Sequence, residues 1–350
     1  MEPILPSLGQ ILPAIADRAT ALDRSGDWPQ QDLADLGGVG AWRWFVPPDC
    51  GGEGIDPLEL HLRYEAIAAA SLATALVLSQ RDSAVGLING ADDWPLRSEY
   101  LRRMSRGECF ATIGIAQLTT SRQVGAPALR ASAMADGYRL DGVIPWCTGA
   151  AKAEIVIAGA ALEDGQQILF ALPMDLPGVR IDPPLPLVSL RSSWTARIQC
   201  HSAALPQRWI MRGPVAKALA GRSKGLVISQ AFLAFGLCRG GLQLIGKHDS
   251  DRARSLVLKF SEQLESLRSR TIELCQAGRE SDAAAAAPAL RGACNDLAVR
   301  ITQSAVALYK GSALLLDHPA QRLAREAMFL LVWSCPDAVI DCTVNALAQG

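Results

Sequence analysis

The residue pattern changes twice along this chain of 350 residues, and these two changes constrain the fold more than any other feature. Over residues 4–109, apolar side chains recur at the spacing of helices that bury one face. Over residues 112–205, short runs suited to strands alternate with Asp-Gly, Gly and Pro, which end strands and form turns. Helical spacing returns from Gly225 onward. The pattern predicts an α+β, mostly α fold with an N-terminal helical domain (1–111), a small β-barrel or sandwich domain (112–206) and a C-terminal four-helix bundle (207–350).

Several elements can be placed within this pattern. Strands are expected at four short runs: 138–140, 155–158, 168–172 and 196–200. The run 225–245 is apolar nearly all round and contains glycines that allow close packing, so it predicts a central buried helix. The alanines at 283–287 indicate a low-complexity linker between two helices of the bundle.

Composition excludes several functions. The net charge is -1 with 20% charged residues, so no basic surface for nucleic acid is expected. Apolar runs are interrupted well short of the ~20 residues that a membrane-spanning helix needs. The chain starts without a basic segment followed by an apolar one, so we expect a cytoplasmic protein. A small molecule is the expected ligand.

The cysteines and histidines are scattered. The chain has 9 Cys and 4 His, without a C-x-x-C pair and without histidines at the spacing of a metal site. We therefore expect no metal and no disulfide framework. Most cysteines should be small buried hydrophobic residues.

Within the β region, three motifs follow one another in a fixed order. A polar turn at 118–121 (Leu-Thr-Thr-Ser) precedes a hairpin at 136–142 (Asp-Gly-Tyr-Arg-Leu-Asp-Gly) and the sequence Trp-Cys-Thr-Gly at 146–149. This order resembles the flavin-binding segment of the acyl-CoA dehydrogenase family, which has a Thr-Glu-Pro turn, a Gly-Tyr-x-Leu-x-Gly hairpin and a Trp-x-Thr strand. The segments 45–54 and 189–195 resemble further motifs of that family, so the resemblance covers essentially the whole chain.

The resemblance implies bound FAD. Trp146 would pack on the isoalloxazine ring, Thr148 would approach its reactive nitrogen, and Gln117 would reach the pyrimidine edge. The complete set of implied cofactor contacts is Gln117, Thr119, Ser121, Trp146, Thr148 and Gly311. These residue types suit a flavin, which needs hydrogen-bonding groups at its polar edge and an apolar wall. The alternative for Trp146 is a tryptophan that fills the core of a small β domain.

The chain departs from the family pattern in three places. Thr120 and Ser121 replace the Glu and Pro of the turn. A shorter turn, 246–254, replaces the family's Arg-x-Gln-Phe-Gly loop; its Lys247, Arg252 and Arg254 would contact a diphosphate or form a solvated charged turn. A single glycine, Gly311, remains of the Gly-Gly-x-Gly cluster. Arg322 and Arg325, after that cluster, are similar to the family's Arg-x-x-Arg. They would either contact the cofactor or join the bundle to the N-terminal domain.

The catalytic base of the family is also missing. Acyl-CoA dehydrogenation requires a desolvated carboxylate to remove the proton alpha to the thioester. Ser334 stands where the family usually has this Glu, and the stretch 227–230, where some members carry it instead, has no carboxylate. Asp337 is the nearest replacement, with a cap of the helix expected at 338–348 as its alternative role.

Three functions remain open at this point. The first is an FAD-dependent oxidoreductase of fatty-acid metabolism that oxidises an acyl thioester, passes electrons to an acceptor flavoprotein and assembles as a homodimer or homotetramer. The second is a flavin-dependent oxygenase of the same fold. The third is a catalytically inactive binding protein. The resemblance favours the first.

Overall fold

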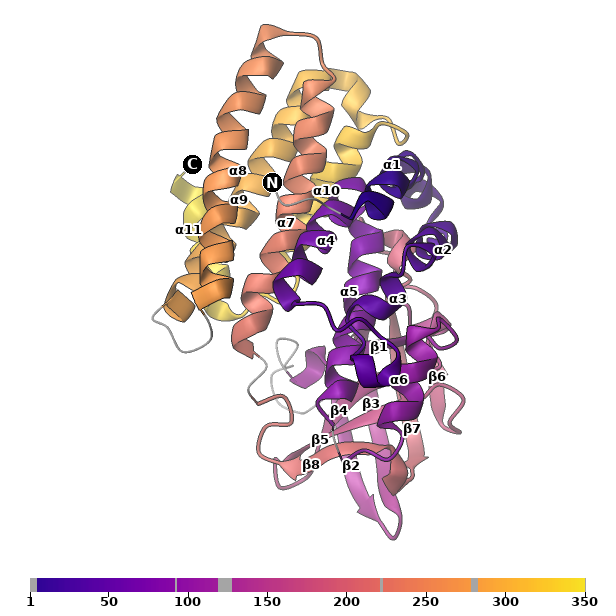
Figure 1. Ribbon diagram of the computed structural model, residues 1–350. Helices are drawn as coiled ribbons and strands as arrows, with labels where there is room; N and C mark the ends of the chain where they lie inside the picture. Colours follow the sequence, from indigo (N-terminus) through magenta and orange to yellow (C-terminus); the bar gives the residue numbers. More distant parts are fainter. Residues whose placement is uncertain (1–4, 92, 119–127, 221–222, 278–282, 350) are drawn as a thin grey trace.

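The computed structural model describes residues 5–91, 93–118, 128–220, 223–277 and 283–349. It consists of N-terminal helices, a central sheet and C-terminal helices, so the predicted α+β, mostly α fold class is confirmed. In Figure 1 the bundle and the sheet lie at opposite ends of the molecule, and the N-terminal helices pack between them.

Six helices and one 3-10 turn form the N-terminal part. They are α1 (Pro6–Ser25), α2 (Gln30–Gly38), α3 (Ala41–Trp44), η1 (Pro48–Cys50), α4 (Pro57–Ala70), α5 (Leu72–Asn89) and α6 (Arg97–Ser105). Local chemistry sets the starts of the longer ones. The carboxylate of Asp56 accepts a hydrogen bond from the backbone N–H of Leu58 at 2.8 Å, and the Ser71 hydroxyl caps α5. The turn expected at 45–54 contains η1.

Eight strands form one mixed sheet. They are β1 (Ala111–Gly114), β2 (Leu129–Met134), β3 (Gly137–Cys147), β4 (Ile155–Ala161), β5 (Gln167–Pro173), β6 (Val179–Ile181), β7 (Ala196–Leu205) and β8 (Ile210–Val215). Their order is β6-β7-β3-β2-β4-β5-β8, with β1 paired to β4. The four expected strands lie within β3, β4, β5 and β7. The sheet continues past residue 206, where the sequence places the end of the β domain; the domain boundaries remain a prediction.

The C-terminal part consists of long helices. They are α7 (Ser223–Gly246), α8 (Asp251–Ala277), α9 (Ala283–Tyr309), α10 (Pro319–Val332) and α11 (Asp337–Gln349), with η6 (Lys310–Leu314) after α9. The prediction of a linker at 283–287 is wrong, because these alanines form the first turns of α9. Alanine has the highest helix propensity of any residue, so an alanine run extends a helix more readily than it interrupts one.

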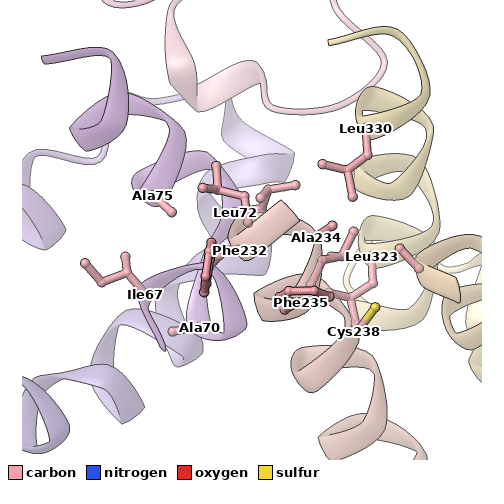
Figure 2. Packing of buried hydrophobic residues seen from close by; sticks show 14 of the residues in the cluster. Ile67, Ala70, Leu72, Ala75, Phe232, Ala234, Phe235, Cys238, Leu323 and Leu330 are labelled. Carbon is pink, nitrogen blue, oxygen red and sulfur yellow. The ribbon is translucent and has the colours of Figure 1, made fainter. Parts of the chain in front are cut away.

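The main hydrophobic core joins the N-terminal helices to the bundle. Phe232, Phe235 and Cys238 of α7 are fully buried in the same cluster as Ile67 of α4 and Leu323 of α10. Figure 2 shows α7 between the N-terminal helices on one side and α10 on the other. The expected central buried helix is thus α7.

One glycine of α7 permits this close packing. A Cβ at Gly236 would lie 2.5 Å from the Cβ of Ala68 and 2.5 Å from the Glu65 carbonyl oxygen on α4. We expect Gly236→Ala to lower the free energy of unfolding by about 1–3 kcal/mol, since the two helices must move apart. Urea denaturation measures this loss. The control is Gly9→Ala in α1, which meets nothing within 4 Å and should be neutral or stabilising. Equal stability of the two variants would contradict the close packing.

The cysteines behave as packing residues. All nine are unpaired, and seven of them are buried. In the described ranges, no group of three His, Cys, Asp or Glu side chains is arranged to hold a metal ion. None of the described helices is both long enough and apolar enough to span a bilayer.

Candidate functional site

Trp146 is exposed because β3 contains a bulge at its end. Ile144 pairs with Ile198 of β7, whereas Cys147 pairs with Ala196, so β3 has one residue more than β7 across this step. An extra residue shifts the alternation of side chains between the two faces of a sheet. Ile144 and Cys147 are therefore buried, and the indole of Trp146 is 48% exposed. Trp146 is not a core residue.

Thr148 follows the bulge and belongs to a short series of buried hydroxyl groups. Its Oγ1 lies 3.2 Å from Oγ1 of Thr195, which lies 2.8 Å from Oγ of Ser193. All three residues are buried. A hydroxyl can both donate and accept, so Thr148 retains the capacity for one more hydrogen bond to a ligand. Burial raises the pKa of the neighbouring Cys147 thiol, so that thiol stays neutral.

The backbone around these hydroxyls is held in uncommon conformations. Leu190 and Trp194, on either side of the 3-10 turn η4 (Arg191–Ser193), have φ of 57° and 47°. Gly149 has φ of 66°, and its N–H donates to the Ser193 carbonyl at 2.9 Å. The Trp194 indole N–H is fixed by the Gly26 carbonyl at 2.9 Å. Strained backbone of this kind is concentrated at functional sites, where the surroundings enforce it.

Gln117 presents an unpaired acceptor at the same edge of the sheet. Its Nε2 donates to the carbonyls of Gly114 and Gly159, both at 2.9 Å, so both amide hydrogens are used. Its Oε1 is buried and has no hydrogen-bond partner in the described part of the chain. A Cβ at Gly114 would lie 3.8 Å from the Cβ of Cys147, which places this residue close to the end of β3. A buried acceptor without a donor points to a ligand that supplies one.

These features fit the isoalloxazine part of a flavin. The ring offers an apolar face for Trp146, a nitrogen for the Thr148 hydroxyl and an N–H at its pyrimidine edge for Gln117 Oε1. Two further implied contacts, Thr119 and Ser121, lie outside the described residues.

The residues implied for the rest of the dinucleotide lie elsewhere. Gly311 is in η6, and Tyr309 before it donates from its hydroxyl to the Leu244 carbonyl at 3.0 Å. The charged turn between α7 and α8 is therefore next to η6, at the end of the bundle away from the sheet (Figure 1). Arg254 is paired with Asp249 and Asp251 of its own turn, as expected for a solvated surface turn. Lys247 and Arg252 are exposed. A single chain does not bring Gly311 together with Trp146.

The arginines of α10 are structural. Arg325 forms an ion pair with Asp23 of α1 at 2.5 Å, and Arg322 pairs with the buried Glu326 at 2.9 Å. Arg322 also donates to the Thr20 hydroxyl of α1 at 3.3 Å. The alternative role, joining the bundle to the N-terminal helices, is the one that these contacts support.

Ser334 and Asp337 lie in and after the turn between α10 and α11. Ser334 is half-buried with φ of 51°, a strained conformation for serine. Asp337 is exposed and is the first residue of α11, so the helix begins one residue earlier than expected. The Pro336 carbonyl accepts from Val339 and Ile340, so Asp337 is within the first turn rather than before it. An exposed carboxylate lacks the desolvation that a base for this reaction needs.

Sequence reasoning missed a buried arginine beside this turn. Arg291 of α9 is 1% exposed and donates to Gln230 Oε1 at 2.6 Å and to Asn295 Oδ1 at 3.0 Å. Its guanidinium carbon lies 5.9 Å from the centre of the Trp333 ring. No described carboxylate pairs with it, and burial lowers its pKa. The available signal was a charged residue and an amide four positions apart, Arg291 and Asn295, in an otherwise apolar run.

Comparison with known proteins identifies the wider family. Residues 13–108 match the family described as acyl-CoA dehydrogenase, N-terminal domain. A probable acyl-CoA dehydrogenase of Bacillus subtilis is 24% identical over 90% of this chain and 89% of its own. Butyryl-CoA dehydrogenase from Megasphaera elsdenii has a TM-score of 0.81 at 18% identity, covering 100% of this chain and 99% of its own. A nitrososynthase from Micromonospora carbonacea var. africana has a TM-score of 0.78 at 20% identity, covering 99% and 97%. The chain is therefore similar to acyl-CoA dehydrogenases: residues 13–108 match the model of their N-terminal domain, and the chain has the fold of their solved structures.

Proposed function

We propose that this protein is an FAD-dependent oxidoreductase that acts on an acyl thioester of CoA or of a carrier protein. The observation that carries the proposal is the exposed Trp146 at the end of β3, with the Thr148 hydroxyl, which can form one more hydrogen bond, and Gln117 Oε1, which has no partner among the described residues. A buried acceptor without a donor is unfavourable unless a ligand supplies one, and the exposed indole offers an apolar surface that such a ligand could cover. The resemblance and the named relatives make FAD the expected ligand.

Each residue has a defined task in this proposal. Bound FAD would supply the hydride acceptor. Trp146 would cover one face of the ring and keep water from it. Thr148 would hydrogen-bond to the reactive nitrogen. Two backbone acceptors fix the orientation of the Gln117 amide, and its Oε1 would accept a hydrogen bond from an N–H of the pyrimidine edge. Ser334 would line the acyl pocket without acting as a base, because a serine hydroxyl is too weak a base on its own.

Proposed partners follow from the surfaces of the bundle. The turn between α7 and α8, which lies next to η6, is at the end of the bundle away from the sheet that contains Trp146 (Figure 1). One cofactor would therefore contact both Gly311 and Trp146 only if a second copy of the chain contributed. Exposed apolar side chains follow the outer faces of α10 and α11: Met328, Val332, Ile340, Val344 and Leu347. Such a face favours association of copies into a homodimer or homotetramer. In a dehydrogenase, an acceptor flavoprotein would remove the electrons.

A flavin-dependent oxygenase is the second candidate. Its support is the serine at position 334, because the chemistry of an oxygenase does not need a carboxylate base at that position. The nitrososynthase is a structural neighbour with a different named activity, which shows that this fold serves more than one chemistry.

The visible spectrum of the purified protein tests the proposal. We expect a flavin spectrum, and we expect Trp146→Ala to weaken FAD binding about tenfold through loss of aromatic packing. The control is Met134→Ala, since Met134 of β2 is equally exposed at 48%. Bleaching by acyl-CoA in the absence of oxygen would support the dehydrogenase. No bleaching, with oxygen consumed once the flavin is reduced, would support the oxygenase. Failure to bind added FAD would reject both.

A further inference from the structure

Arg291 is a buried charge without a counter-ion among the residues that the structure describes. Buried arginines are normally paired with a carboxylate, because an isolated charge in a protein interior is strongly unfavourable. Here the partners within the described part of the chain are all neutral: the amides of Gln230 and Asn295 and the Leu330 carbonyl. The positive charge is therefore solvated by dipoles but not neutralised.

The hydrogen-bonding capacity of Arg291 is also not exhausted. A guanidinium carries five N–H groups. Three are used, by Nε toward Asn295, by Nη1 toward Gln230 and by Nη2 toward the Leu330 carbonyl at 3.4 Å. One N–H remains on each terminal nitrogen. Two N–H groups on neighbouring nitrogens form the fork that matches the two oxygens of a carboxylate.

The position of Arg291 connects it to the proposed acyl pocket. Gln230, its closest acceptor, ends the stretch of α7 where some relatives carry the catalytic Glu. Trp333, whose ring faces the guanidinium, directly precedes Ser334, the other such position. Gln230 and Trp333, which are more than a hundred residues apart in the sequence, therefore meet at the same side chain. Ser334, directly after Trp333, has a strained φ of 51°.

We propose that Arg291 binds an anionic group on the acyl part of the substrate, so that the preferred acyl thioester carries a carboxylate on its chain. This inference rests on the proposed function, since it assigns the substrate class of the same pocket. The carboxylate would replace the missing counter-ion and accept the two remaining N–H groups. Trp333 would move with the turn to admit it. Gln230 and Asn295 are positioning residues that fix the plane of the guanidinium.

The test compares pairs of acyl-CoA thioesters that differ in the terminal carboxylate. Adipoyl-CoA and hexanoyl-CoA form one such pair, and shorter and longer pairs cover the unknown depth of the pocket. Isothermal titration calorimetry of the FAD-loaded wild type should show at least one pair in which the carboxylate raises affinity by about tenfold or more. Arg291→Met should abolish or reverse this preference. Arg291→Lys, which keeps the charge but loses the fork, should retain only part of it.

The control variant is Arg300→Met. Arg300 lies on the same helix and is already paired with Asp296 at 2.8 Å, so its loss should leave the preference unchanged. If Arg291→Met does not fold, the wild-type preference and Arg291→Lys decide the question. Equal or weaker binding of the carboxylate-bearing member in every pair would overturn the inference and leave the proposed function intact. Absence of binding by any acyl-CoA would instead reject CoA thioesters as the substrate in the proposed function, and would overturn this inference with them.

Discussion

Glu65→Ala is expected to lower the free energy of unfolding by about 3 kcal/mol, among the largest losses for a single side chain of this protein. The Glu65 carboxylate is 4% exposed and accepts from Arg239 Nε at 2.5 Å and from Arg268 Nε at 2.9 Å. These arginines come from α7 and α8, so one carboxylate of α4 holds two helices of the bundle. Its removal leaves two partly buried cations side by side that repel each other. Arg268 loses the acceptor of its Nε, and Arg239 keeps only the exposed Glu265 among its described partners.

The control for Glu65 uses the same arginine. Arg239 also donates to Glu265 at 2.9 Å, but the Glu265 side chain is 52% exposed. We expect Glu265→Ala to change the free energy of unfolding by less than about 1 kcal/mol, because water replaces an exposed partner. Urea denaturation of both variants, followed by circular dichroism, measures the difference. A loss below about 1 kcal/mol for Glu65→Ala would mean that the arginines find solvent and that the ion pairs do not hold the bundle to α4.

The fold was accessible from the sequence because it is encoded by periodicity. Helical and strand spacing are local properties, and the three regions that they define appear as helices, sheet and helices. The failed prediction at 283–287 relied on composition instead of propensity: alanine repetition was taken for a linker although alanine favours helix.

The site was accessible only in part. The motif around Trp146 and Thr148 could be recognised, but the exposure of Trp146 depends on a bulge, which requires the partner strand to be known. The hydroxyl series depends on Ser193 and Thr195, which β7 and its preceding turn bring to Thr148 from more than forty residues away. Arg291 was not found from the sequence for the same reason. Its lack of a described counter-ion depends on the packing of three helices, and the spacing of residues along one helix does not show it.

His61 makes the protein sensitive to acid. Its ring is stacked on Phe232 at 5.4 Å between centroids, and its Nδ1 is buried without a hydrogen-bond partner among the described residues. Burial lowers the pKa of His61 to about 4, against the opposing charge of Asp56. In the unfolded chain the pKa is about 6.5. Between these values the unfolded state binds more protons than the folded state, so the contribution of His61 to stability is lost as pH falls from about 6.5 to 4.

The expected size of the acid effect is about 3 kcal/mol, since each pKa unit corresponds to about 1.4 kcal/mol. The substitution His61→Phe preserves the stacked ring and removes the titrating group. As pH falls from about 7 to 4, the wild type should therefore lose about 3 kcal/mol of stability relative to this variant. Urea denaturation at several pH values measures the difference in free energy of unfolding between the two proteins. Groups that titrate in both proteins cancel in this difference. The exposed His201 provides the control, as His201→Phe removes a histidine outside the core. Parallel stability curves for wild type and His61→Phe would show that the His61 ring can be protonated in place, and that α4 and α7 separate enough at this contact to admit water.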